Sequence, residues 1–252
     1  MTLADRHALV TGGGTGIGAA IALALAGDGA TVTITGRRDG PLREIASRSE
    51  RIHWRIMDVR DEVMITGGIE AASDEHGAID ILVANAGIAE TAPLHKITLE
   101  HWREVQRINV EGVMLSMRGV VTGMTERGWG RIIAISSIAG LSGLRYCAAY
   151  SASKHAVIGL VKSVAEEVLM SGVTVNALCP GYVMTPLVER NIEKIMARSN
   201  MDHDEALAAL RDTNPFGRMI EPQEVATAVL WLCGPGSGAI TAQAIPISGG
   251  QI

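Results

Sequence analysis

The sequence predicts an α/β fold, a doubly wound parallel sheet of about seven strands with helices on both faces. Short β-branched apolar runs alternate with longer helical stretches, which is the pattern of strand–helix–strand units. Glycine and small aliphatic residues are abundant, whereas aromatic residues make up only 3% of the chain. Such a composition suits a sheet that helices cover on both faces. A length of 252 residues fits one α/β domain, so we predict a single domain over residues 1–252.

The order of apolar runs gives the expected elements. Strands are predicted at residues 7–11, 31–35, 52–57, 79–84, 131–135, 173–178 and 244–248. Helices are predicted at residues 19–26, 61–76, 101–124, 148–170 and 221–232. Residues 184–218 interrupt the alternation after the sixth strand. Because open α/β sheets bind ligands at the carboxyl ends of their strands, we predict a small helical substrate lid there.

Composition excludes several classes of protein. A formal net charge of −5 and the lack of basic clusters interleaved with aromatics exclude a nucleic-acid partner. No unbroken apolar stretch reaches transmembrane length, so no membrane partner is expected. The N-terminal residues run directly into the first strand, which leaves no room for a signal peptide and predicts a cytoplasmic protein. The seven histidines show no metal-ligand spacing, so no metal is predicted.

The three cysteines, Cys147, Cys179 and Cys233, lie far apart and lack disulfide or zinc spacing. They are predicted to be small buried hydrophobic residues in a reducing compartment. The alternative for Cys147 is a place in the wall of the substrate site, because it lies three residues before Tyr150.

A glycine-rich loop follows the first predicted strand. It reads Gly12-Gly-Gly-Thr-Gly-Ile-Gly18 and leads directly into an apolar helix. The N-terminus of such a helix offers free N–H groups and a dipole that favours anions. We expect Gly12 to make the turn, Gly16 to let the backbone approach a pyrophosphate, and Gly18 to let the helix pack closely. A merely flexible turn is the alternative, but the strand–loop–helix context predicts a Rossmann-type dinucleotide site that includes Thr15 and Ile17.

The residues after the second strand bear on the choice of cofactor. Gly36 occupies the position where an acidic residue would hold the ribose hydroxyls of NAD, and Arg37 and Arg38 follow it. An arginine here favours the 2′-phosphate of NADP, so Arg37 predicts NADP with NAD less favoured. The alternatives are that both arginines are solvated or that Asp39 turns inward to a ribose. Asp58 and Val59, after the third strand, are predicted to meet the adenine.

Asparagines mark two further places. Asn85 and Gly87 end the fourth strand, where the backbone can pass close to a cofactor. Asn109 lies among apolar residues of a predicted helix, although asparagine has poor helix propensity and four hydrogen-bonding valences to satisfy. It either stabilises a kink or holds an ordered water that connects Lys154 to solvent. The sequence does not favour one over the other.

The residues with the chemistry of a catalytic site follow the fifth strand. Tyr150 and Lys154 are four residues apart near the start of a predicted helix, so they share one face. A neighbouring ammonium is expected to lower the pKa of the phenol and make Tyr150 a usable general acid or base. Ser136 or Ser137, at the end of the strand, can hold the oxygen being protonated. A chance pair on a solvated helix end is the alternative.

In order and spacing, these motifs resemble the short-chain dehydrogenase/reductase family over nearly the whole chain. The matching pieces are Thr11–Gly18, Asn85-Ala-Gly87, Asn109, Ser137, Tyr150-x-x-x-Lys154 and Pro180-Gly181. The resemblance selects Ser137 over Ser136 and implies that Ser137 orients a carbonyl and Tyr150 transfers the proton. It implies that Lys154 binds ribose and tunes Tyr150, and that Asn109 holds a relay water. The implied cofactor contacts are Gly12, Thr15, Gly16, Ile17, Gly18, Arg37, Asp58, Val59, Asn85, Gly87, Tyr150, Lys154, Pro180, Gly181, Val183 and Thr185.

The function implied is an NADP(H)-dependent oxidoreductase that interconverts a ketone and a secondary alcohol. Several stretches resemble 3-oxoacyl thioester reductases, polyketide ketoreductases and 3-hydroxybutyrate dehydrogenases, so the expected substrate is a 3-oxoacyl thioester of coenzyme A or a carrier protein. One alternative is a catabolic NAD(P)-dependent dehydrogenase of a hydroxy acid or a cyclic alcohol. A catalytically silent NADP-binding sensor is another, and the intact Ser137, Tyr150 and Lys154 argue against it.

Two surfaces suggest partners. The helix that carries Tyr150 is apolar nearly all round, which predicts coverage by a second subunit in a homotetramer, as the family resemblance also implies. Coverage by the preceding helix alone is the alternative. If residues 186–199 are helical, Arg190, Lys194 and Arg198 form a basic stripe. It is either a solvated face or a contact for the phosphates of a thioester carrier.

Overall fold

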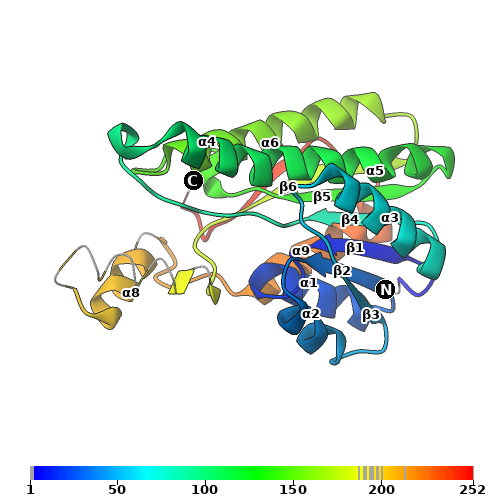
Figure 1. The fold of residues 1–252 in the computed structure, drawn as a ribbon, viewed down its shortest axis with the longest axis horizontal. Coiled ribbons are helices and arrows are strands. Elements are labelled where there is room, and N and C mark those ends of the chain that lie inside the picture. Colours follow the sequence, from blue (N-terminus) through cyan, green and yellow to red (C-terminus); the bar gives the residue numbers. More distant parts are fainter. Residues whose placement is uncertain are drawn as a thin grey trace.

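The protein is built around one parallel sheet of seven strands (Figure 1). The computed structural model describes residues 3–186, 188–189, 192, 196, 199, 201–212 and 214–251. The strands are β1 (His7–Thr11), β2 (Thr31–Gly36), β3 (Ile52–Ile56), β4 (Ile81–Ala84), β5 (Gly130–Ile135), β6 (Val173–Pro180) and β7 (Ala244–Ile247). Their order is β3-β2-β1-β4-β5-β6-β7, and every neighbouring pair is parallel. This confirms the predicted fold class.

The strand order reverses between β1 and β4. The chain first winds outward from β1 to β3, then returns to place β4 on the other side of β1. At such a reversal the connections leave β1 and β4 in opposite directions, so a crevice opens above the carboxyl ends of these two strands. The glycine loop follows β1, and Asn85 follows β4, so both predicted cofactor segments meet there.

Helices cover both faces of the sheet and form two apolar cores. The first core lies under α1 (Gly16–Gly27), α2 (Asp39–Ala46) and α9 (Pro222–Cys233). The second lies under α3 (Glu62–His76), α5 (Gly112–Glu126) and α6 (Ala148–Glu167) on the opposite face (Figure 1). The central strands β1, β4 and β5 are buried throughout, because both of their faces are covered. Their uninterrupted apolar runs are the sequence signature of that position.

The predicted helix 101–124 is wrong as a single regular element. The segment consists of α4 (Leu99–Gln106), a π-helical turn at Arg107–Glu111 and then α5. Helix α2 was not predicted, and the strand predicted at 79–84 begins only at Ile81. The predicted helix 148–170 ends at Glu167. Helix α1 begins at Gly16, three residues before the predicted start at 19. The remaining boundaries shift by one or two residues, within the usual fraying of element ends.

The predicted lid contains a helix beside the main body. Helix α8 (His203–Arg211) begins with a capping box in which the Asp202 side chain accepts a hydrogen bond from Glu205 N. Its buried residues pack with Val188, Ile192 and Met219 in a small separate core. Arg190, Lys194 and Arg198 lie outside the described residues, so their predicted stripe stays a prediction.

The described part of the chain contains neither a membrane-spanning helix nor a cluster of metal ligands. None of its helices is long and apolar enough to cross a membrane. It also contains no group of three or more histidine, cysteine, aspartate or glutamate side chains arranged to hold a metal ion.

The loop–helix junction generates a stability prediction. A Cβ at Gly18 would collide with the Gly12 carbonyl oxygen, whereas a Cβ at Gly27, in the same helix, would meet nothing within 4 Å. We expect Gly18→Ala to lower the free energy of unfolding by about 1–3 kcal/mol, because the loop must shift. The control Gly27→Ala is expected to be neutral or to stabilise by up to about 1 kcal/mol, because alanine has the higher helix propensity. Urea denaturation without cofactor measures both. Equal stabilities of the two variants would contradict the close packing at Gly18.

Candidate active site

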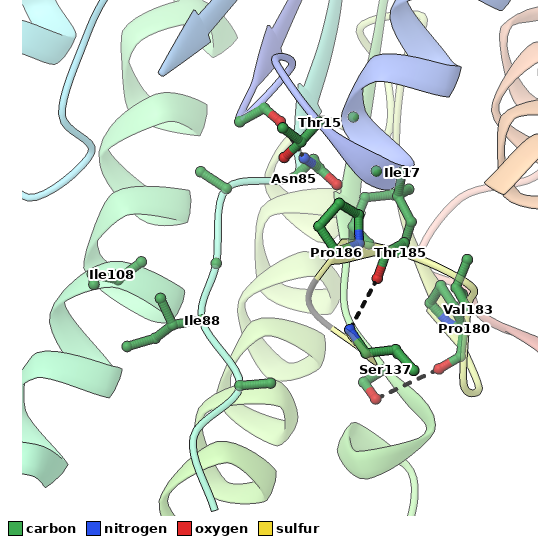
Figure 2. Close-up of a pocket in the computed structure, with 18 of the residues that line it drawn as sticks. Thr15, Ile17, Asn85, Ile88, Ile108, Ser137, Pro180, Val183, Thr185 and Pro186 are labelled. Carbon is green, nitrogen blue, oxygen red and sulfur yellow. Dashed lines mark hydrogen bonds between the residues drawn. The ribbon is translucent and has the colours of Figure 1, made fainter. Parts of the chain in front are cut away.

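A cavity of about 660 Å³ opens at the carboxyl ends of the central strands (Figure 2). Every predicted cofactor contact lines it, and so does Ser137. Asn109 is the predicted site residue that does not line the cavity, although its neighbour Ile108 does. Residues from six strand ends, β1 to β6, and from the start of the lid therefore meet in one space.

The glycine loop has the conformation of an anion-binding turn. Gly12 and Gly16 have φ values of +67° and +55°, in the left-handed region that glycine adopts without strain. Thr15 precedes the first turn of α1, and its side chain makes no capping hydrogen bond there. The first N–H groups of α1 therefore lack a side-chain cap at the cavity wall. Such a helix N-terminus fits the pyrophosphate of a dinucleotide.

Asn85 ties the end of β4 to this loop. Its Nδ2 donates to the carbonyl oxygens of Thr11 and Gly12 at 2.9 and 3.2 Å. The backbone N–H groups of Asn85 and Ala86 both donate to Thr11 Oγ1 at 3.0 Å. The Asn85 amide is thus committed to the shape of the loop, while the backbone after it lines the cavity.

The end of the cavity that lies beyond β2 carries two arginine side chains. Arg37 and Arg38 are exposed and line the wall. Asp39 does not turn inward, because its carboxylate pairs with Arg43 Nε at 2.7 Å within α2. The Asp58 carboxylate pairs with Arg60 at 2.6 Å. Arg60 and, more weakly, Arg37 lower the pKa of Asp58.

The two candidate serines have different partners. Ser136 Oγ donates to the Lys154 carbonyl at 3.1 Å, which ties β5 to α6. Ser137 lies at the end of β5, accepts from Ala139 N at 3.1 Å and donates weakly to the Pro180 carbonyl at 3.5 Å (Figure 2). Interaction with the Ser137 hydroxyl lowers the pKa of the Tyr150 phenol. Ser137, and not Ser136, therefore acts on the tyrosine.

Lys154 is the most deeply buried charge at the site. Its side chain comes from α6, only 5% of the residue is exposed, and Nζ donates to the Ile135 carbonyl at 2.8 Å. Nζ lies 5.7 Å from the centre of the Tyr150 ring. Burial lowers the pKa of Lys154 to about 8. The ammonium therefore stays mostly protonated at neutral pH but exchanges its proton easily.

The expected lowering of the Tyr150 pKa is wrong for the protein without cofactor. Burial raises the pKa of Tyr150 to about 12, and interaction with Ser137 offsets only part of this effect. Since Lys154 loses its proton near pH 8, it is already neutral when the phenol titrates. It then has no charge with which to stabilise the phenolate. Tyr150 is consequently a protonated phenol throughout the neutral range.

Asn109 lies at the π-helical turn and holds a neighbouring loop. Its Oδ1 accepts from Ile88 N, and its Nδ2 donates to Ile88 O, both at 2.9 Å. The second Nδ2 hydrogen points to Ser153 Oγ at 3.0 Å. Both donors of this fully buried amide are thus occupied. These bonds go to the loop after β4 and to α6, and not to the helix that carries Asn109. The relay-water role therefore stays a prediction.

Some residues in the cavity wall were missed or misjudged. Cys179 and Cys233 are buried as predicted, but Cys147 is only half-buried and lines the cavity. The prediction for Cys147 as a buried residue is therefore wrong, because the turn before α6 faces the cavity. Glu90 and Tyr182 also line the wall. Tyr182 directly follows the Pro180-Gly181 motif and could have been noticed, whereas only the fold places Glu90.

Comparisons with known proteins agree with this geometry. A family model for short chain dehydrogenases matches residues 6–195. An acetoacetyl-CoA reductase of Rhizobium meliloti is 38% identical over 246 residues, covering 98% of each chain. A cis-4-hydroxycyclohexanecarboxylate dehydrogenase of Sinomonas cyclohexanicum is 38% identical over 251 residues, covering 98% of this chain and 96% of the relative. A crystal structure of a variant actinorhodin polyketide ketoreductase with NADPH has a TM-score of 0.96 and 36% identity, covering 100% of this chain and 99% of that one.

The buried ammonium generates a prediction about stability and pH. Folding lowers the pKa of Lys154 from 10.5 to about 8, so the unfolded chain binds this proton more tightly. The resulting penalty is fully present below pH 8 and disappears as the pH rises through 10.5, and it amounts to about 3 kcal/mol. Lys154→Met removes the charge, keeps the length of the side chain and loses a hydrogen bond worth about 1 kcal/mol. We expect the variant to be more stable by about 2 kcal/mol at pH 7.

Urea denaturation at pH 7 and at pH 10 measures this difference. The gain should shrink at the higher pH, where the wild-type lysine is largely neutral. Lys162→Met, on the exposed face of the same helix, is the control and should change little. A loss of stability in Lys154→Met at pH 7 would contradict the desolvation penalty.

Proposed function

This chain belongs to the short-chain dehydrogenase/reductase family, and from that premise we propose that it is an NADP(H)-dependent reductase of 3-oxoacyl thioesters. Family membership makes it an oxidoreductase that interconverts ketones and alcohols. The observation that carries the proposal is that Ser137, Tyr150 and the buried Lys154 line one cavity, which fits a dinucleotide.

The residues present fit a nicotinamide dinucleotide. The glycine loop and the start of α1 would hold the pyrophosphate, Asp58 and Val59 the adenine, and Lys154 a ribose. Pro180, Gly181, Val183 and Thr185 would border the nicotinamide, with the Thr185 hydroxyl near its carboxamide. When bound, the reduced nicotinamide supplies the hydride that adds to the carbonyl carbon.

The side chains of the protein handle the oxygen and the proton. Ser137 donates a hydrogen bond to the carbonyl oxygen and holds it beside the Tyr150 phenol. Tyr150 donates its proton to that oxygen as negative charge develops, and a pKa of about 12 keeps it protonated and ready at neutral pH. Lys154, with a pKa of about 8, lies close enough to stabilise the transient phenolate. Its proton exchange then returns Tyr150 to the neutral form. In our proposal Asn109, through the turn that it holds, positions the water that links Lys154 to solvent.

Charge at the far end of the cavity supports NADP over NAD. Arg37 and Arg38 line the wall where the adenosine ribose would lie, and the nearest alternative, Asp39, is paired with Arg43. A 2′-phosphate would gain charge-assisted hydrogen bonds there, whereas ribose hydroxyls would find no free carboxylate at Asp39.

The thioester is supported by the relative that reduces acetoacetyl-CoA, which matches this chain over nearly its whole length. A second candidate is a dehydrogenase of a cyclic hydroxy acid, which the similarly matched Sinomonas protein favours. Assays with both nicotinamides on acetoacetyl-CoA and on 4-hydroxycyclohexanecarboxylate distinguish the two by turnover and by direction.

The proposal extends to assembly and compartment. One face of α6 stays uncovered by α4 and α5: Ala148, Ala156 and Gly159 are exposed, and Ala152, Leu160 and Val164 are half-buried. Such a small apolar face supports a homotetramer in which a second copy covers α6. Light scattering at micromolar concentration should give the tetramer mass, and a monomer mass would contradict it.

We also propose a cytoplasmic location, where reduced cysteines and NADPH coexist.

Removal of the Tyr150 hydroxyl should stop turnover while NADPH binding is retained. Tyr150→Phe is expected to lower kcat by roughly 10²–10⁴-fold, because the general acid is removed. NADPH affinity, measured by fluorescence titration, should change little. Near-normal turnover of acetoacetyl-CoA by this variant would contradict the assigned role.

Removing Arg37 should separate the two cofactors. Arg37→Ala is expected to weaken NADPH binding about tenfold or more, because a charge-assisted phosphate contact is lost. NADH binding should be nearly unaffected. Arg48→Ala, which removes an exposed arginine that does not line the cavity, is the control. Equal losses for NADPH and NADH would show that Arg37 does not bind the 2′-phosphate.

A further inference from the structure

An acidic side chain lies in the wall of the substrate half of the cavity. The described lining residues include two carboxylates, Asp58 and Glu90. Asp58 lies at the adenosine end and is paired with Arg60. Glu90 follows β4 on the loop that leads away from Asn85 and Gly87, and it has no role in the reaction described above.

The loop that carries Glu90 is anchored on both sides. Two residues before it, both backbone groups of Ile88 are bonded to the buried Asn109 amide at 2.9 Å. Two residues after it, Ala92 N donates to the Tyr146 carbonyl at 2.8 Å. Tyr146 has a φ of +65°, which is strained for a tyrosine, and it lies only four residues before Tyr150. The loop is thus tied to the turn that leads into the catalytic helix, with Glu90 midway between the anchors.

Little in the described structure neutralises the Glu90 carboxylate. Among the described residues, the basic side chain that pairs with it is His101, whose Nδ1 lies 3.6 Å from Oε2, longer than a good hydrogen bond. No arginine or lysine of the described residues forms an ion pair with it. The cationic side chains that line the cavity are Arg37 and Arg38 at the adenosine end and Lys154 beneath Tyr150. The other cavity-lining residues around the turn before α6 are uncharged: Ile138, Leu144, Cys147 and Tyr182. Arg145 belongs to the same turn, but it does not line the cavity and its guanidinium lies over the Tyr146 ring at 4.7 Å.

From this arrangement we propose that Glu90 is a specificity residue that excludes substrates carrying a free carboxylate near the reacting carbonyl. The inference rests on the proposed function and narrows its substrate class to neutral 3-oxo esters and thioesters. In acetoacetate the carboxylate lies two carbons from the reacting carbonyl carbon, whereas in an ester the same carbon bears no charge. The Glu90 side chain is 52% exposed at the cavity wall, so its repulsion of an anionic ligand acts partly through water and weakens as salt screens it. Free 3-oxo acids and 3-hydroxy acids are therefore poor substrates, although their reacting groups are identical.

The test compares acetoacetate with ethyl acetoacetate, a matched anion and neutral ester, using the full-length protein and NADPH. The readout is the ratio of kcat/KM for acetoacetate to that for the ester. Glu90→Gln should raise this ratio roughly tenfold at low salt, because one repulsive charge is removed. The ratio should rise with added salt in the wild type and stay flat in Glu90→Gln. Glu100→Gln, which removes an exposed charge on α4 that does not line the cavity, should leave the ratio unchanged.

A ratio that is the same in the wild type and Glu90→Gln, or an equal rise in Glu100→Gln, would overturn the proposal. Calorimetric binding of both ligands to the NADP⁺ complex gives a second, independent measure. Weak acetoacetate binding that improves in Glu90→Gln supports the role of Glu90 even if neither compound is turned over. Absence of turnover on acetoacetate, ethyl acetoacetate and acetoacetyl-CoA would instead contradict the proposed function, so the two failures are distinguishable.

Discussion

The hydrogen bond from the buried Lys154 ammonium to the Ile135 carbonyl organises the site. It joins α6 to the end of β5. Ser136 Oγ reinforces this link by donating a hydrogen bond to the Lys154 carbonyl. A glycine leaves room for this approach, because a Cβ at Gly140 would meet the Lys154 carbonyl oxygen at 2.8 Å. Among the causes that shift the Lys154 pKa there is no carboxylate. The protein therefore accepts an unpaired buried charge, whose cost the apolar cores on both faces must offset.

The parallel sheet explains why residues far apart in sequence meet around that ammonium. Strands β1, β4, β5 and β6 end at one edge, and each continues into a segment that lines the cavity. Side-chain amides then fix the loops relative to one another: Asn85 binds the loop after β1, and Asn109 binds the loop after β4. The π-helical turn is what brings the Asn109 amide to Ile88, so an irregularity in one helix sets the position of a loop from another part of the chain.

Local patterns were sufficient for the sheet and for most of the cavity wall. Strands such as β1 and β5 are short, apolar and followed by glycine or serine, so their ends and the residues after them could be read directly. The π-helical turn could not, because it depends on Ile88, 21 residues away from Asn109. The Tyr150 pKa was misjudged for a related reason. Helical spacing gives the distance to Lys154, but the direction of the pKa shift depends on burial of the phenol by the folded chain, which Ser137 only partly offsets. Glu90 had no sequence signal at all.

The cavity is electrically asymmetric, and the asymmetry follows from where each strand ends. Arginines after β2 make one end positive, which suits a phosphate-rich cofactor. The loop after β4 places Glu90 at the other end, near a turn lined by uncharged side chains. Between them, Lys154 is held below the surface of the cavity and Tyr150 remains a neutral phenol. A polyanion is therefore attracted to one end, while the other end favours a ligand without negative charge. In our proposals this asymmetry places the phosphate-rich cofactor and the reacting carbonyl in opposite halves of one continuous cavity.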